Sequence, residues 1–423
     1  MARKMKDSGI EWIGEIPEEW KLTKTKYCYT NHKDVVGSSA DEYERLALTL
    51  NGVIKRSKED ANGLQPESFS SYQILRTNEL VFKLIDLQNV STSRVGYSPY
   101  TGIVSPAYII LRPNENTESQ YGAYYFLSMW QREVFNHIGD DGVRSSLNAS
   151  DLLNISYLQI PLPEQRRIAS FLDAKCALID AAIDKTRASI EEYKKLKQAI
   201  ITEAVTKGVR GKKRRMKDSG IEWIGEIPEE WETHLLKHSL KWKSEKGMPD
   251  AMVLSLYRDF GVIPKDSRDD NHNVTSLDTG SYKIVDKGDL VINKMKAWQG
   301  SLAISKYSGI VSPAYHVCTV VNDNLVIMYL HYLLRNQLYL PEYSRLSTGM
   351  RIGQWDLSFD DFKNLPFVLP SKDEQQEIVN YIDNKLQKID SLINCKDHII
   401  SELETLKKSI IFEYVTGKKE VPA

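Results

Sequence analysis

The chain has 423 residues, of which 41% are hydrophobic and 27% charged, so it is long enough for two or three globular domains. Its net charge of −1 argues against a nucleic-acid-binding protein that works alone, because such proteins are usually basic. The four scattered cysteines exclude a disulfide framework and a Cys-x-x-Cys zinc site, and no apolar run approaches the roughly 20 residues of a membrane-spanning helix. A cytoplasmic location is therefore expected.

A polar leader opens the chain and recurs in its middle. Residues 5–20 and 216–231 both read MKDSGIEWIGEIPEEW, and no apolar stretch follows the basic residues of the first copy, so it is not a signal peptide. The sequence GIVSPAY likewise occurs at 102–108 and at 309–315. We therefore predict a tandem duplication whose halves share one fold and form a pseudo-twofold molecule.

Each copy continues into a segment of about 140 residues, 21–163 and 232–370, which is a normal domain size. Short β-like runs and one helix-like stretch in each, 121–138 and 325–340, predict a small α+β domain with a mixed or antiparallel sheet. The two segments share little sequence, so we expect a common framework that carries two different working surfaces.

A long helix is predicted to close each copy, over residues 164–207 and 371–417. A stripe of mostly apolar residues recurs there in alternating steps of four and three, which is the spacing of a coiled-coil seam. The stripe comprises positions 179, 183, 186, 190, 193, 197, 200 and 204 and the same positions shifted by 210. A helix of roughly 65 Å must bury this stripe, and its twin, packed antiparallel, is the simplest partner. An ordinary pair of core helices is the alternative.

Four prolines, Pro161, Pro163, Pro366 and Pro370, are expected to stand just before these helices and to end the preceding strands. Between the two copies lies the basic segment 208–220, GVRGKKRRMKDSG, which we interpret as a solvated connector, with a phosphate-contacting or hinge strand as the alternative. The predicted layout is leader and first domain 1–163, helix 164–207, linker and repeated leader 208–231, second domain 232–370, helix 371–417 and tail 418–423.

Sequence signals of catalysis are missing. The chain has neither a P-loop nor a Gly-x-Gly-x-x-Gly after a strand, and residues 364–367 lack the first proline of the Asn-Pro-Pro-Tyr motif of amino-methyltransferases. His234 and His238 have the spacing of zinc ligands, but Leu235 stands where a zinc protease needs glutamate, so we interpret them as a surface pair. These absences favour a binding protein over an enzyme.

The order of these segments resembles the specificity subunit of type I restriction–modification systems. A leader ending Ile-Pro-Glu-Glu-Trp at 16–20, a variable domain, and a proline-rich lead into a helix beginning Glu-Gln-Arg-Arg-Ile-Ala at 164–169 are followed by a second such set. The run NKMKAWQG at 293–300 before the second GIVSPAY is also similar to sequences of that family. The resemblance covers essentially the whole chain.

The resemblance implies two target-recognition domains that each read one half of a split DNA sequence, held at a fixed distance by the long helices. It also implies docking of two methylation subunits, which bind S-adenosylmethionine, and of restriction/translocase subunits. On this hypothesis the chain itself is not catalytic and needs no cofactor, and partner subunits supply basic surface that its own charge does not provide. Two different domains would read an asymmetric bipartite target of double-stranded DNA.

Candidate DNA-contacting residues are chosen by chemistry, because Arg and Lys pair with guanine and Asn and Gln with adenine in the major groove. The loops 140–148 and 347–355 combine glycine with polar side chains, so we predict contacts from Arg144, Ser145, Arg351 and Gln354. A second group of candidates comprises Lys55, Arg56, Lys294, Lys296 and Gln299. Trp20 and Trp231, inside the repeated leader, are assigned to packing.

Two alternatives stay open on the sequence alone. One is a stand-alone DNA methyltransferase or nuclease with cryptic motifs, which would turn over without any partner. The other is a structural coiled-coil scaffold, which would bind no DNA even with a methylation subunit present.

Overall fold

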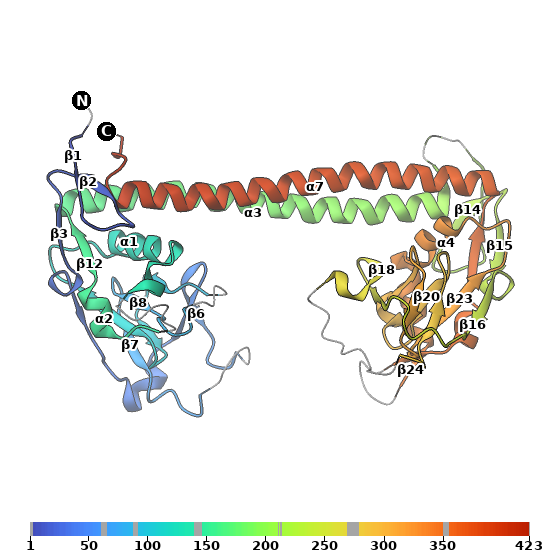
Figure 1. Cartoon of the computed structure of the whole chain (residues 1–423), viewed down its shortest axis with the longest axis horizontal. Helices are drawn as coiled ribbons and strands as arrows, with labels where there is room; N and C mark the ends of the chain where they lie inside the picture. Colours follow the sequence, from blue (N-terminus) through green and yellow to red (C-terminus); the bar gives the residue numbers. More distant parts are fainter. Residues whose placement is uncertain are drawn as a thin grey trace. The chain divides into compact units, whose positions relative to one another are not determined.

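The computed structural model describes residues 3–60, 66–87, 92–138, 146–209, 211, 214–268, 279–349 and 355–422. It divides into two compact units, residues 1–186 with 398–423, and residues 187–397. Each unit holds one globular domain and about half of each long helix, α3 (Leu162–Lys207) and α7 (Lys372–Val415) (Figure 1). The predicted α+β class with two long helices is therefore confirmed.

In the first unit the leader forms a hairpin, and two four-stranded sheets follow. The hairpin strands are β1 (Met5–Asp7) and β2 (Glu15–Pro17). The central sheet is antiparallel, in the order β4 (Tyr29–Asn31), β11 (Ile109–Pro113), β8 (Leu80–Phe82), β9 (Val95–Tyr97). The outer sheet runs β6 (Gly52–Arg56), β5 (Arg45–Thr49), β10 (Gly102–Val104), β7 (Gln73–Leu75). It is mixed, because β10 pairs with β5 in parallel and with β7 antiparallel.

The other elements of this unit cover the central sheet and link it to the long helices. Strand β3 (Lys21–Lys24) pairs with β12 (Ser156–Gln159) just before α3 begins. The helices are α1 (Ser119–Gln131) and α2 (Ala149–Asn154), with short 3-10 turns at Thr25–Tyr27, Gly37–Glu42 and Val134–His137.

Strand β8 shows why these runs are wholly apolar. Leu80 and Phe82 belong to the core under the helices, whereas Val81 belongs to the core shared with the outer sheet, and all three are fully buried. A strand covered on both faces needs apolar residues at every position.

The second unit repeats this plan. Its hairpin is β13 (Met216–Asp218) with β14 (Glu226–Pro228), and β15 (Glu232–Leu235) pairs with β26 (Pro366–Leu369) before α7. The central antiparallel sheet runs β16 (Leu240–Lys243), β23 (Tyr315–Val320), β20 (Leu290–Asn293), β21 (Leu302–Ile304). Strand pairs β17 (Leu254–Tyr257) with β18 (Gly261–Pro264) and β19 (Lys283–Val285) with β22 (Gly309–Val311) form the outer layer, and β24 (Ser347–Thr348) pairs with β25 (Asp356–Leu357).

The helices of this domain are α4 (Ile327–Leu334), α5 (Leu340–Leu346) and α6 (Phe359–Phe362), with 3-10 turns at Leu236–His238, Lys265–Ser267, Ala297–Gln299 and Gln337–Tyr339. The single helix expected at 325–340 is therefore wrong: α4 ends at Leu334, and a 3-10 turn precedes α5. The stretch expected at 121–138 is likewise divided, because Glu133 has a left-handed backbone (φ +59°) between α1 and the following 3-10 turn.

The long helices pair antiparallel within each unit. In the first unit, Phe171 packs against Tyr414 with ring centroids 4.5 Å apart and the rings tilted by 41°, and Lys407 Nζ lies 2.7 Å from Asp180. In the second, Lys197 Nζ lies 2.5 Å from Asp390. The predicted seam positions of both helices are buried or half-buried, and the positions between them are mostly exposed, as a coiled coil requires.

The ends of the long helices differ slightly from expectation. Helix α3 begins at Leu162, so Pro163 lies inside its first turn and not before it. Proline is tolerated there because the first amide groups of a helix have no partner within it. Gly208 and Gly417, both with positive φ, follow the helix ends and provide the left-handed residue that commonly terminates helices. No described helix is long and apolar enough to cross a membrane.

Candidate nucleic-acid interface

The four leading candidates for DNA contact, Arg144, Ser145, Arg351 and Gln354, lie outside the described residues. What is described is how each of their loops is anchored. Near the end of the first loop, the Leu147 amide donates to the Leu84 carbonyl at 2.9 Å. Just after the second loop, the Leu357 amide donates to the Lys294 carbonyl at 3.0 Å. Both loops therefore return beside the turn that follows the central strand β8 or β20.

The helices after these loops start with side-chain caps that the sequence analysis overlooked. Asn148 accepts from the Asp151 amide at 3.0 Å, and its own amide donates to that aspartate at 3.1 Å. Ser358 accepts from the Asp361 amide at 3.1 Å in the second domain. An Asn or Ser three residues before an acidic side chain is a recognisable helix start and could have located α2 and α6.

In the second domain, two predicted groups of residues meet. Lys294 Nζ lies 2.8 Å from an Asp356 carboxylate oxygen, which joins the turn after β20 to the end of the 347–355 loop. Trp298 packs edge-on against Trp355, with ring centroids 5.2 Å apart. This support leaves Lys296 and Gln299 exposed.

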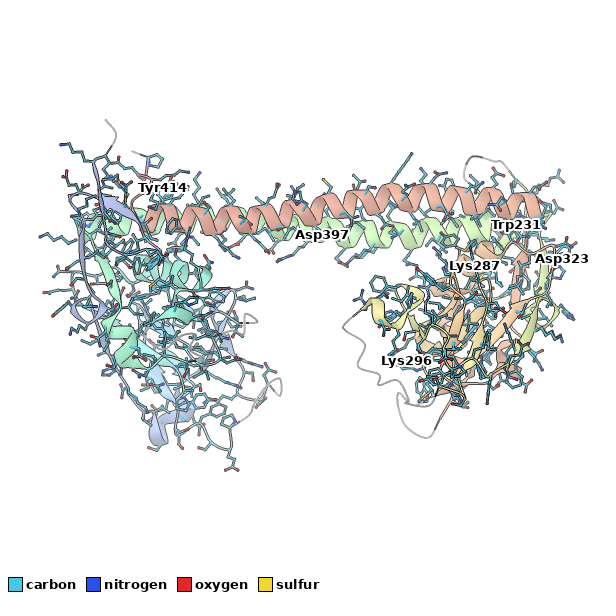
Figure 2. All side chains as sticks on the ribbon, viewed as in Figure 1. Trp231, Lys287, Lys296, Asp323, Asp397 and Tyr414 are labelled. Carbon is cyan, nitrogen blue, oxygen red and sulfur yellow. The ribbon has the colours of Figure 1, made fainter. Side chains whose placement is uncertain are left out.

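The position of Lys296 within its domain suits a contact surface. Lys296 lies at the end of the domain away from the long helices, whereas Trp231 lies beside them (Figure 2). Among the residues that the structure describes, no ion pair of Lys296 is found. Its ammonium group is thus available to an external anion.

Lys55 and Arg56 stand apart from the loop ends, on β6 of the outer sheet. Lys55 Nζ lies 2.6 Å from Glu44 and above the Tyr100 ring, and the hydrogen bond to Glu44 raises the pKa of Lys55. Arg56 Nε lies 2.7 Å from Asp60. Both line a groove of about 500 Å³ that also contains Glu42 and Glu59. This mixed charge is a weaker indication of DNA contact than the exposed Lys296.

Each domain is fixed to its long helices by a buried glutamine that the sequence analysis missed. Gln375, fully buried, accepts from the Val326 amide at 2.7 Å and donates to the Asn324 and Pro370 carbonyls, both at 2.9 Å. Gln165 makes the same three contacts in the first unit, to Glu118, Asn116 and Ile160. The one signal in the sequence is that Glu-Gln recurs in the first turn of both helices, which does not itself show that the glutamine is buried.

Tyrosines of the domain helices add to this joint. Tyr121 of α1 donates to the Val415 carbonyl at 3.1 Å, and Tyr329 of α4 donates to the Val205 carbonyl at 3.2 Å. Tyr124 donates to Asp173 at 2.8 Å, with the equivalent bond between Tyr332 and Asp383. Each domain is thereby held in a defined orientation on its own helix segments.

The repeated leader packs as expected. Trp20 and Trp231 are fully buried, and their indole nitrogens donate to Glu164 and Glu374 at 3.2 and 3.0 Å. Arg214 also pairs with Glu374, so this residue of the basic segment is part of the leader's packing and not a free connector.

The predicted surface histidines carry no sign of a metal site. His238 is exposed, and His234 lies 3.0 Å from Glu232. No group of three metal-ligating side chains occurs among the residues with assigned positions.

Comparison with known proteins finds a family model and relatives to which this chain is similar. Residues 228–405 match the type I restriction modification DNA specificity domain. The chain is 25% identical to the protein named as the type I restriction enzyme MjaX specificity subunit of Methanocaldococcus jannaschii, over 97% of this chain and 96% of that protein.

Two solved structures share the fold. One, from work on assembly and conformational transition of a type I R-M system, has a TM-score of 0.67 at 15% identity and covers 96% of this chain and 99% of that one. The HsdS subunit from Thermoanaerobacter tengcongensis has a TM-score of 0.52 at 16% identity, covering 98% of this chain and all of that one.

Proposed function

We propose that this chain, which belongs to the specificity subunits of type I restriction–modification systems, reads an asymmetric bipartite DNA target with one half-site for each domain. Recognition of DNA sequence within a type I complex follows from the family itself. The observation that supports an asymmetric target is that a repeated framework holds two domains with different surfaces. Lys294, for example, has the buried Leu84 as its structural equivalent. Unlike readers cannot recognise two identical half-sites in the same way.

The chemistry is assigned to partner subunits. The sequence carries no P-loop and no Asn-Pro-Pro-Tyr, which supports a chain that is not itself catalytic. S-adenosylmethionine would then be bound by the methylation subunit, and restriction/translocase subunits would complete the complex. The function of this chain would be to select the sequence.

Two methylation subunits are expected, because each unit offers an equivalent exposed apolar residue on a long helix. Leu406 in the first unit is 48% exposed and Leu196 in the second is 46% exposed, and the two occupy the same position of the repeat. An exposed leucine at the same place in both copies is what two identical partners would contact.

Co-expression with the methylation subunit, followed by methylome sequencing of the host DNA, tests the proposal. We expect a single new adenine-methylation motif with two different half-sites and a fixed spacer. A palindromic motif would refute the asymmetric target, and no motif at all would refute DNA reading in this complex. Turnover by the purified chain with S-adenosylmethionine and DNA alone would instead support a stand-alone enzyme.

Native mass spectrometry of the complex tests the stoichiometry. Leu196→Asp or Leu406→Asp should each remove one of two bound methylation subunits, and the double variant should remove both. Leu178→Asp is the matched control, because Leu178 is 67% exposed but its counterpart in the repeat is Lys388. Two bound methylation subunits in the double variant would contradict the assignment.

A further inference from the structure

The second domain gathers three lysines around an exposed tryptophan, close to the anchored end of the 347–355 loop. Lys283 is only 8% exposed; its ammonium group donates to the Tyr315 carbonyl at 2.6 Å and lies 5.9 Å from the Trp242 ring. Lys246 pairs with Lys283 across an isolated β-bridge. Tyr315, whose carbonyl accepts the bond from Lys283, pairs with Asn293 in the central sheet. The third lysine, Lys294, is the next residue after Asn293.

The aromatic residues of this cluster also come from elements that meet where the 347–355 loop ends. Trp242 is 52% exposed and stacks on Phe359, at a centroid distance of 6.1 Å and an interplanar angle of 27°. It also contacts His316 edge-on at 6.5 Å, and the His316 ring is 3.1 Å from the Leu357 carbonyl. Because the Leu357 amide in turn binds the Lys294 carbonyl, the lysines and the aromatic wall form one continuous surface.

The charges in this cluster are unbalanced. Burial lowers the pKa of Lys283, and Lys294 and Lys246 lower it further as neighbouring cations. Asp356 pairs with Lys294 and is the one carboxylate that forms an ion pair with these lysines in the described part of the chain. One carboxylate does not balance three neighbouring ammonium groups, so an anion bound beside them would be stabilised by the excess positive charge.

The repeat provides an internal comparison. In the first domain the equivalent bridge joins Val35 to Gln73, and Gln73 donates to the Tyr108 carbonyl at 2.6 Å, just as Lys283 donates to that of Tyr315. The fold thus accepts a neutral amide where Lys283 stands. Asn31 replaces Trp242, since both stand in the edge strand opposite the same central strand. The lysines and the tryptophan are therefore not needed to build the domain.

We propose that Lys246, Lys283 and Lys294, walled by Trp242, form a DNA phosphate-binding site that is specific to the second domain. This proposal rests on the proposed function. It adds the place at which the sugar–phosphate backbone of the DNA crosses this domain. Trp242 would pack against the deoxyribose beside the bound phosphate. The first domain lacks the site, so the two domains hold the backbone differently.

The test uses the full complex with the methylation subunit and measures binding to a duplex carrying the motif found for the wild type, and to an unrelated duplex, over a range of salt. Lys283→Gln copies the first domain's own residue and Lys246→Ala alters an exposed side chain, so both should fold. Each should weaken binding to both duplexes by a similar factor and reduce the slope of log K against log salt by about 1. Lys287→Glu is the control, because Lys287 is exposed in the same domain but lies nearer the long helices than Lys296 (Figure 2).

The outcomes separate this site from the function it depends on. Wild-type affinity and salt slope in both variants would overturn the phosphate site while leaving DNA reading intact. Loss of binding only on the target duplex would overturn it too, because that pattern indicates a base contact. A wild-type complex that binds neither duplex would overturn the proposed function as well. If inorganic phosphate displaced the DNA at concentrations too low to act through ionic strength, the site would be assigned to a free anion instead of DNA.

Discussion

Replacing Gln375 by leucine should loosen the second domain from its long helix. Leucine has nearly the same size, so the change removes three hydrogen bonds, those to Val326, Asn324 and Pro370, without opening a large cavity. At about 1 kcal/mol for each net bond, the loss is about 3 kcal/mol, and it is higher if the Val326 amide finds no water.

Hydrogen exchange followed by mass spectrometry gives the local readout. A loss of about 3 kcal/mol should speed exchange in peptides covering α4 by roughly a hundredfold, since 1.4 kcal/mol corresponds to a factor of ten. Gln376→Leu is the matched control, because the neighbouring Gln376 is exposed and bonds only to Asn380 at 3.0 Å among the contacts described. Equal exchange in the Gln375 and Gln376 variants would refute the view that the glutamine holds the domain to its helix.

Three further predictions concern the buried His331, the close packing at Gly122 and the seam of the long helices. Burial holds the pKa of His331 at about 3, so below pH 6.5 the unfolded chain takes up a proton that the folded protein does not, and stability should fall by up to about 1.4 kcal/mol per pH unit; His331→Asn should flatten this pH dependence in urea unfolding. Gly122→Ala should destabilise by about 1–2 kcal/mol, because the new Cβ would lie 1.9 Å from the buried Tyr29 hydroxyl, which outweighs a gain in helix propensity near 1 kcal/mol. Asp180→Asn should change stability by less than about 1 kcal/mol, whereas Ile183→Asn in the buried seam should cost about 3 kcal/mol or more, as thermal unfolding would measure.

Controls for these changes are built into the chain. Equal loss of stability at low pH in the wild type and the His331→Asn variant would contradict the assignment of this pH dependence to His331. Tyr29→Phe should partly restore the stability of the Gly122→Ala variant, and simple additivity of the two changes would contradict the proposed clash. Equal losses for Asp180→Asn and Ile183→Asn would show that the ion pair, and not the apolar seam, stabilises the helix pair.

The sequence predicted the repeated plan, because its signals are local or periodic. The step pattern of four and three along 179–200 marks the seam whatever surrounds it, and the buried and half-buried positions of α3 follow that pattern. The sixteen-residue leader predicts the same packing twice, and Trp20 and Trp231 are buried against equivalent glutamates.

Local signals say less where contacts between distant segments decide. Chemistry alone nominated Arg144 and Arg351, which lie outside the described residues and stay predictions. It also nominated Lys55 without showing that Lys55 pairs with Glu44. The sequence analysis did not select Gln375, because a glutamine at the start of a helix is expected to be exposed until its buried partners are known.

The amino-acid sequence by itself determined that two copies of one framework end in a pair of seam-bearing helices, because periodicity and repetition are properties of neighbouring residues. Only the tertiary structure decided that Lys246, Lys283 and Lys294 meet beside Trp242, because these residues come from separate segments around the central sheet. Their shared charge depends on strand register, which no stretch of sequence encodes on its own.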